Sequence, residues 1–181
     1  MSVLGVVRPM EERDLERVLS WRNHPDVRRW MYTTHEIGVE EHQRWFEGCC
    51  DDPHRHLLVY ESDGASLGFV NLKQLGGEDV AEWGFYLGPG APKGSGRGLG
   101  VAALDHAFDT LGLQKVRGHA LAENERSIRF HLRLGFQDEG LRHEQHTGPD
   151  GEPHSVACFG ILKDQWPVAR AAIMKMEEDD Q

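Results

Sequence analysis

A glycine-rich segment in the middle of the chain has the composition of a phosphate-binding loop. Between Ala91 and Gly100, every second residue from Gly94 onward is glycine, and the segment also carries Lys93 and Arg97. Glycines let successive backbone N–H groups approach an anion, and the N-terminus of a following helix adds partial positive charge. A phosphate or pyrophosphate suits such a loop, although a turn that merely joins a strand to a helix can have the same composition.

Two common phosphate loops fit this segment poorly. A Walker loop requires Lys and then Ser or Thr after its last glycine, whereas Lys93 precedes Gly94. A dinucleotide-binding loop requires a strand directly before its glycines, whereas the expected strand ends at Leu87, well before the GxGxxA match at Gly98–Ala103. The loop is therefore expected to belong to another kind of fold.

A second cluster, between Trp21 and Phe46, combines arginine, histidine, methionine and aromatic residues. Guanidinium and imidazole groups can bind a diphosphate, and flat aromatic or methionine side chains can sandwich a base. That chemistry suits a nucleotide-sugar ligand. An amphipathic helix pair, with its aromatic residues in the core and its arginines in solvent, explains the same pattern without a ligand.

The histidines and cysteines do not predict a metal centre. The pairs His54–His56 and His143–His146 have ligand-like spacing, but no cysteine or carboxylate cluster accompanies them. The three cysteines form neither a disulfide framework nor a CxxC pair, and they suit a reducing cytoplasm: Cys49, Cys50 and Cys158. We expect no metal ion and a cytoplasmic location.

The elements that must position these residues are those of a mixed α/β domain. Helices are expected at residues 11–21 and 39–50, and strands at 57–60, 67–72 and 82–87. A helix with apolar residues four apart follows the glycine loop, from Leu99 to Leu111. A strand at 116–121, a helix at 124–134 and a strand at 156–162 complete the order. The acidic run Glu177–Asp180 is expected to be solvated and mobile.

Charge and length exclude two classes of partner. The chain has 181 residues and a formal net charge of −10, and an acidic surface repels nucleic acid. No apolar run approaches the roughly 20 residues that cross a bilayer, and no export signal is visible. We expect a small-molecule substrate, no nucleic acid, no membrane, and a monomer or homodimer.

Two segments resemble motifs of the GNAT superfamily of acyl-CoA-dependent N-acetyltransferases. The glycine loop resembles the family's Gln/Arg-x-x-Gly-x-Gly/Ala motif in either of two registers, Ala91–Gly96 or Ser95–Gly100. The segment Asn124–Phe136 resembles the family's Asn-x-x-Ser/Ala…Tyr-x-x-x-Gly-Phe helix, with His131 at the Tyr position. The resemblance implies a mixed, mostly antiparallel sheet that splays between two central strands, in an acetyltransferase domain at residues 1–166 followed by a tail at 167–181.

The resemblance also implies acetyl-CoA as co-substrate. The loop's backbone amides would hold the pyrophosphate, and strand 82–87 would pair with the pantetheine arm. The implied coenzyme contacts are Phe85, Tyr86, Leu87, Lys93, Gly94, Ser95, Gly96, Arg97, Gly98, Asn124 and Ser127.

Acetyl transfer requires a deprotonated amine and a proton for the departing thiolate. Glu82, at the start of the central strand, and His119, on the next strand, are the candidate bases, although a strand histidine without a catalytic part explains His119 equally well. His131 is the candidate acid, and Tyr86 is a further acid or anchoring candidate.

The N-terminal pattern is similar to the nucleotide-sugar N-acetyltransferases of pseudaminic acid biosynthesis. These enzymes acetylate the 4-amino group of a UDP-linked amino-dideoxy sugar that is used in flagellin glycosylation. The resemblance implies phosphate contacts from Arg22 and His42, uracil contacts from three further side chains, and weaker contacts from a neighbouring strand: Met31, Tyr32 and Trp45, then Asn71 and Lys73. A protein N-terminal acetyltransferase of the ribosomal-protein type and a non-catalytic acyl-CoA sensor are the alternatives.

Overall fold

A mixed sheet forms the centre of the computed structural model, which describes residues 4–77 and 79–179. In the described residues, seven strands lie in the spatial order β1-β2-β3-β4-β5-β7-β6. Only β4 and β5 are parallel; every other neighbouring pair is antiparallel. The strands are β1 (Val6–Pro9), β2 (Arg55–Ser62), β3 (Ala65–Gln74), β4 (Val80–Leu87), β5 (Lys115–Leu121), β6 (Gln137–Thr147) and β7 (Pro153–Leu162).

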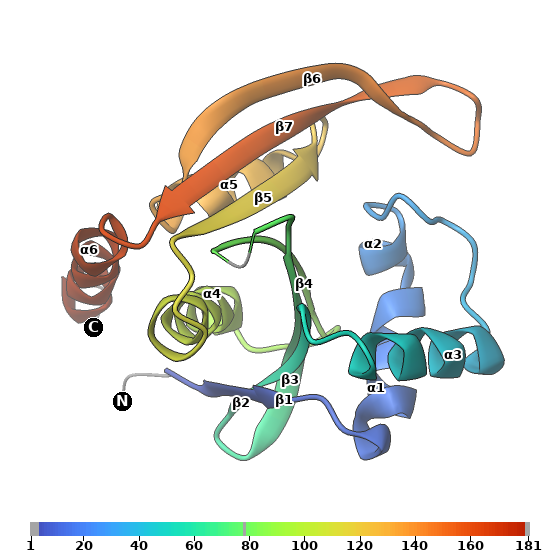
Figure 1. Ribbon diagram of the computed structural model, residues 1–181, viewed down its shortest axis with the longest axis horizontal. Helices are drawn as coiled ribbons and strands as arrows, with labels where there is room; N and C mark the ends of the chain where they lie inside the picture. Colours follow the sequence, from blue (N-terminus) through green and yellow to red (C-terminus); the bar gives the residue numbers. More distant parts are fainter. Residues whose placement is uncertain (1–3, 78, 180–181) are drawn as a thin grey trace.

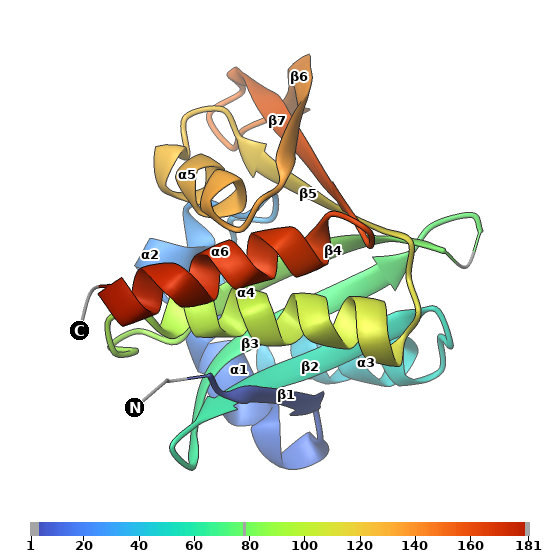
Figure 2. The same cartoon turned by 90° about the vertical axis from the view of Figure 1, so that its left-hand side faces the viewer.

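Helices cover both faces of this sheet (Figure 1, Figure 2). On one face of β2–β4 lie α1 (Leu15–Asn23), α2 (Pro25–Arg28) and α3 (Val39–Cys50). On the opposite face of the sheet lie α4 (Ser95–Asp105), over β1–β3, α5 (Glu125–Arg133), against β5 and β6, and α6 (Trp166–Asp179). A 3-10 turn at Glu12–Asp14 precedes α1, and α4 runs on into a π-helical turn at His106–Thr110. No described helix is long and apolar enough to cross a membrane.

The spacing of apolar residues in α4 explains why this helix anchors the core. Leu99, Ala103 and Ala107 recur every four residues and are completely buried against the sheet. The helix begins after Gly94, whose φ of 94° is a left-handed conformation that favours glycine. Gly112, with a φ of 69°, follows the π-helical turn and ends the segment. The helix predicted after the glycine loop is confirmed.

The splay between the two central strands is also confirmed. β4 and β5 pair at only three positions: Val80 with Lys115, Ala81 with Val116, and Glu82 with Arg117. Beyond Glu82 and Arg117 the strands separate, which leaves backbone groups of β4 unpaired on that side. The opening therefore begins at Glu82, one of the two candidate bases.

The segment expected to be a tail beyond residue 166 forms α6 up to Asp179 instead. Trp166 and Ile173 are buried against the core, and the Trp166 indole N–H donates to Asp105 on α4 at 2.8 Å. Ala169 lies directly over Gly135, where no side chain intervenes. A helical apolar face thus holds this segment on the domain. Asp180, the last residue of the acidic run, lies outside the described residues.

Candidate active site

A cleft of about 1310 Å³ opens where β4 and β5 separate and extends to the wall formed by α1, α3 and the segment after α2. Strand register explains which side chains face it. Lys73 lies opposite Glu82, Asn71 opposite Gly84, and Phe69 opposite Tyr86 across the β3–β4 pair. Because directly opposed residues share a face, these side chains point to the helical wall, while Trp83 and Phe85 point to the opposite face.

The two candidate bases meet at the mouth of the splay. His119 Nδ1 lies 3.2 Å from Glu82 Oε2. The pKa of Glu82 is lowered, chiefly by this hydrogen bond, so its carboxylate stays ionised and accepts from His119 Nδ1. His119 Nε2 is then the nitrogen with a free lone pair; it is buried, lines the cleft and has no hydrogen-bond partner among the described residues. A base held in one tautomer by a carboxylate is a proton-accepting arrangement.

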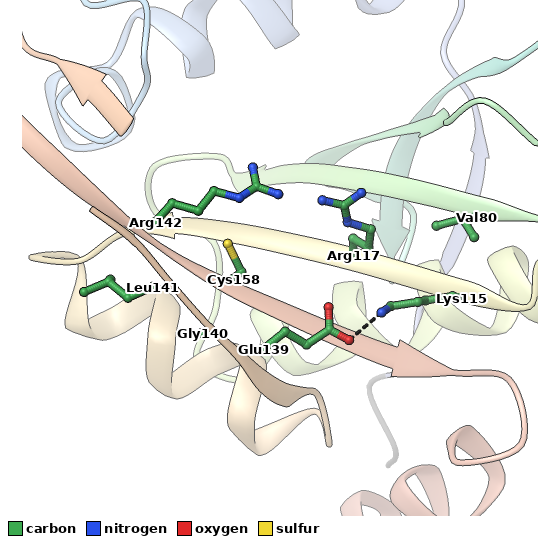
Figure 3. Close-up of a pocket in the computed structure, with 8 residues that line it drawn as sticks. All are labelled: Val80, Lys115, Arg117, Glu139, Gly140, Leu141, Arg142 and Cys158. Carbon is green, nitrogen blue, oxygen red and sulfur yellow. Dashed lines mark hydrogen bonds and ion pairs between the residues drawn. The ribbon is translucent and has the colours of Figure 1, made fainter. Parts of the chain in front are cut away.

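A second, smaller hollow of about 470 Å³ adjoins this pair on the same face of the sheet (Figure 3). Lys115 in it forms an ion pair with Glu139 on β6. The guanidinium groups of Arg117 and Arg142 approach each other beside Cys158, from β5 and β6. Both arginines also lower the pKa of Glu82, which keeps that carboxylate charged. Sequence reasoning missed Arg117, although its alternation with His119 along β5 places both on one face.

Unpartnered polar atoms gather in the large cleft. Among the described residues, five buried side-chain atoms lack a hydrogen-bond partner, and four of them belong to residues that line it: Arg22 Nη1, His42 Nε2, Asn71 Oδ1 and His119 Nε2. The fifth is Ser95 Oγ at the start of α4. Buried polar groups are normally paired, so this concentration indicates a site that receives a polar ligand.

Arg22 is the most constrained of these groups. Its Nη2 donates to the backbone carbonyl of Thr33 at 2.9 Å, while Nη1 stays unpaired. Burial lowers the pKa of Arg22 from its ordinary value, which marks a partly desolvated cation. His42, whose pKa burial also lowers, stacks on Trp45 at a ring separation of 5.1 Å. Arg22 and His42 thus lie in one wall, and no carboxylate of the described residues is bonded to either.

The structure brings all seven sequence-predicted acceptor residues to this cleft. They line its helical wall and its β3 floor: Arg22, Met31, Tyr32, His42, Trp45, Asn71 and Lys73. Tyr32 bridges to the long β6–β7 hairpin through a ring contact of 4.7 Å with His146. Their roles remain predictions. The cleft nevertheless brings together residues that lie up to 51 positions apart in the sequence.

The predicted coenzyme residues divide into two groups. Phe85, Tyr86, Leu87 and Gly96 line the cleft, as do Asn124 and Ser127. The remaining five do not line the cleft and lie in the glycine loop and the first turn of α4: Lys93, Gly94, Ser95, Arg97 and Gly98. The N-terminal turns of α4 and α5 thus lie at the cleft, and first-turn N–H groups have no partner within their helix. Asn124 Oδ1 accepts from the Ser127 N–H at 3.1 Å and caps α5.

His131 does not fit its expected role as a proton donor to the thiolate. The side chain is completely buried and does not line the cleft. Its Nε2 accepts a hydrogen bond from the Trp83 indole at 3.0 Å, and its Nδ1 lies 2.8 Å from the Ser127 carbonyl oxygen. Burial lowers its pKa to about 4, so the ring is neutral at pH 7 and its single N–H points to Ser127. This geometry argues against the expected role, because both ring nitrogens are already bonded behind the cleft.

Tyr86 remains a candidate proton donor or anchoring residue. It lines the cleft and packs on Phe69 at a ring separation of 5.1 Å. Burial raises the pKa of its phenol above its ordinary range, so the O–H is retained at any working pH.

Among the described residues, no group of three His, Cys, Asp or Glu side chains could hold a metal ion.

Comparisons with known proteins agree with this geometry. The family description "Acetyltransferase (GNAT) domain" matches residues 6–137. The chain is 24% identical to acetyltransferase PseH of Campylobacter jejuni over 127 residues, 70% of this chain and 79% of that protein. It is 32% identical to spermidine N(1)-acetyltransferase of Escherichia coli K12 over 145 residues, 76% of each chain.

A solved structure matches almost the whole chain. The crystal structure of spermidine N-acetyltransferase from Vibrio cholerae, in complex with CoA and spermine, superposes with a TM-score of 0.82 at 23% identity. The match covers 90% of this chain and 98% of that one. At that identity the match shows the fold.

Proposed function

The chain belongs to the GNAT acetyltransferase family and is an N-acetyltransferase that uses acetyl-CoA, and from this premise we propose that its acceptor is the amine of a nucleotide-linked amino sugar. The proposed reaction is acetylation of a 4-amino group on a UDP-linked amino-dideoxy sugar, as in the pseudaminic acid pathway. Transfer is direct, with both substrates bound together.

The buried Nη1 of Arg22, which has no hydrogen-bond partner among the described residues, is the observation that carries this proposal. Arg22 is half-buried, and a desolvated guanidinium nitrogen without a partner is unfavourable unless a ligand supplies an acceptor. A diphosphate would accept from Arg22 Nη1, and the adjacent His42 Nε2 could donate a further hydrogen bond. A polyamine would instead bring positive charge next to the Arg22 guanidinium, which repels it.

The apolar part of the same wall supports a base. Trp45 and Met31 line the cleft, and Tyr32 is 52% exposed there. Exposed aromatic faces at a cleft suit stacking on a flat heterocycle. A nucleotide-sized acceptor could therefore place its base and diphosphate along α1–α3 and its amino sugar at the splay.

The residues at the splay support the chemistry of transfer. His119 Nε2 is positioned to take a proton from the acceptor amine while Glu82 stabilises the resulting imidazolium. Asn71 Oδ1 can accept from the same amine, because Asn71 lies opposite Gly84 and nothing fills the space above that glycine. The amine nitrogen then forms the new C–N bond as the C–S bond of the thioester breaks, and Tyr86 is the candidate donor to the thiolate.

A substrate panel tests the proposal. Release of free CoA is measured with a UDP-linked 4-amino sugar, spermidine and a peptide with a free N-terminus, each at the same concentration. Turnover of the sugar with inhibition by UDP is expected. Greater turnover of spermidine or the peptide, or UDP without effect, contradicts the proposal, and tight CoA binding without any turnover indicates a sensor.

A variant pair ties the result to Arg22. Loss of a charge-assisted hydrogen bond is expected to raise the acceptor KM of Arg22→Ala about 10- to 100-fold, with the acetyl-CoA KM unchanged. Arg17→Ala, on the exposed side of the same helix, is the control and is expected to match wild type. Equal losses for both substrates contradict an acceptor-specific role.

A further inference from the structure

We propose that His131 and Trp83 form a brace that fixes the opening between β4 and β5, so that His131 is a positioning residue for the acetyl-CoA slot. The brace consists of the hydrogen bond from the Trp83 indole to His131, with Gly118 packed on it. This inference concerns the coenzyme side of the reaction and does not depend on the identity of the acceptor.

The brace begins where strand pairing ends. Glu82 and Arg117 are the last paired residues of β4 and β5, and the next residues are Trp83 and Gly118. A Cβ atom at position 118 would lie 2.4 Å from His131 Nε2 and 2.8 Å from Trp83 Nε1. The absence of a side chain on Gly118 therefore lets a group from β4 and a group from α5 meet directly beneath β5.

The donors and acceptors fix one arrangement of this pair. An indole N–H can only donate, so His131 Nε2 must accept and Nδ1 must carry the ring proton. Nδ1 then donates to the Ser127 carbonyl oxygen, one turn earlier in α5. A chain of hydrogen bonds thus runs from β4 through His131 to the first turn of α5, whose Asn124 and Ser127 line the cleft.

Aromatic packing holds the brace rigid. The His131 ring stacks on Phe159 of β7 at 4.7 Å with an interplanar angle of 10°. The Trp83 ring stacks on Phe136 at 5.1 Å. Phe85 and Phe130, which line the cleft, pack on each other at 4.8 Å and on the Trp83 ring. One buried hydrogen bond therefore fixes the position of β4 relative to α5, the two elements on either side of the coenzyme slot.

Two substitutions of His131 test the brace in the full-length enzyme, one that breaks the hydrogen bond to Trp83 and one that keeps an acceptor for it. His131→Leu leaves the Trp83 N–H without an acceptor and is expected to raise the acetyl-CoA KM about 10-fold, with a smaller effect on kcat. His131→Gln keeps an acceptor near the Nε2 position and is expected to stay within about 3-fold of wild type. The shape of the kcat–pH profile should be the same in all three proteins.

Substitutions on the other side of the hydrogen bond test the brace even if the His131 variants fail to fold. Trp83→Phe removes the donor but keeps a ring, and it should reproduce the KM effect of His131→Leu. Since both changes break the same bond, the double variant should be no worse than about the more severe single variant. Gly118→Ala should impair acetyl-CoA binding, whereas Gly48→Ala, on α3 with open space around it, should not.

The alternative outcomes are distinct. If His131→Leu and His131→Gln both lose kcat and lose one limb of the pH profile while Trp83→Phe is normal, then His131 is a proton donor and the proposal is overturned. If all variants keep the wild-type acetyl-CoA KM, the brace does not set the coenzyme slot and the proposal fails. Thermal melting of each variant identifies loss of folding, in which case Trp83→Phe decides.

Discussion

In the proposed reaction, the imidazole of His119 and the carboxylate of Glu82 lie where the acceptor amine loses its proton. Glu82 is half-exposed, yet its pKa is lowered because it accepts from His119 and lies near Arg117 and Arg142. A carboxylate that stays charged is a poor proton acceptor but a good partner for an imidazolium. In the proposed reaction, therefore, Glu82 orients the His119 ring and stabilises its protonated form, and His119 exchanges the proton.

Replacing Glu82 by Gln should separate these two functions. The amide is nearly isosteric but uncharged, so it cannot stabilise the protonated form of His119. We expect kcat to fall about 10- to 100-fold, within the range typical of general acid–base groups, with little change in the acetyl-CoA KM. Initial rates of CoA release measure this effect. Glu16→Gln on the exposed side of α1 is the control, and wild-type kcat for Glu82→Gln would contradict the assignment.

At the scale of elements, the start of α4 depends on the left-handed backbone of Gly94. An alanine there must adopt a φ of 94°, which we expect to destabilise the fold by about 1 kcal/mol. The strain would also displace the first-turn N–H groups, so the acetyl-CoA KM of Gly94→Ala should rise several-fold. Gly38→Ala is a matched control, since Gly38 precedes α3 with an ordinary φ of −77° and open space around it. Equal effects of both changes would contradict a special role for Gly94.

The docking of α6 depends on one carboxylate of α4. Asp105 accepts from the Trp166 indole and, at 2.9 Å, from the Arg170 guanidinium. Asp105→Ala leaves the indole N–H without a partner, so we expect a loss of about 1–3 kcal/mol in unfolding free energy, measured by urea denaturation. Asp109→Ala changes an exposed carboxylate in the following turn and should stay within about 0.5 kcal/mol of wild type. An unchanged stability of Asp105→Ala would show that α6 is held by apolar contacts alone.

The elements also show what sequence patterns can and cannot reveal. The spacing of Leu99, Ala103 and Ala107 predicted α4, because a buried helical face must repeat every turn. The pattern missed β6, whose side chains are almost all exposed and which pairs only with β7 at the edge of the sheet. The hydrogen bond that occupies His131 could not be predicted, because its partner, Trp83, lies 48 positions away and no local pattern indicates that contact.

For the whole molecule, charge is distributed unevenly. The chain carries −10 overall, yet the large cleft and the adjoining hollow contain arginines without an ion-pair partner among the described residues, namely Arg22, Arg117 and Arg142. Elsewhere, Arg8 binds Asp14 at 2.7 and 2.9 Å and also binds Glu61. That network joins β1, the turn before α1 and β2. The ion pairs of Arg8 therefore join elements of the fold, whereas Arg22, Arg117 and Arg142 leave positive charge at the cavities without an ion-pair partner in the described part of the chain.

These ionisable groups predict that stability falls with acidification. Arg8 lowers the pKa of Asp14 and of Glu61, so their stabilisation is present above the ordinary carboxylate pKa and is lost as pH falls through the lowered values. His131 acts in the same direction: its folded pKa of about 4 lies below the 6.5 of the unfolded chain. The unfolded state therefore binds a proton first, and His131's contribution is complete above pH 6.5 and is lost between 6.5 and about 4.

The His131 part of this dependence can be isolated by urea denaturation between about pH 7 and pH 4.5. A pKa lowered from 6.5 to about 4 corresponds to a stability change on the order of 3 kcal/mol across the full range of titration. The unfolding free energy of wild type should fall steadily, and His131→Gln, which cannot take up a proton, should give a flatter curve. His143→Gln on exposed β6 should keep the wild-type slope. Parallel curves for wild type and His131→Gln would mean that His131 is protonated as easily in the folded protein as in the unfolded chain, contrary to its buried acceptor bond with Trp83.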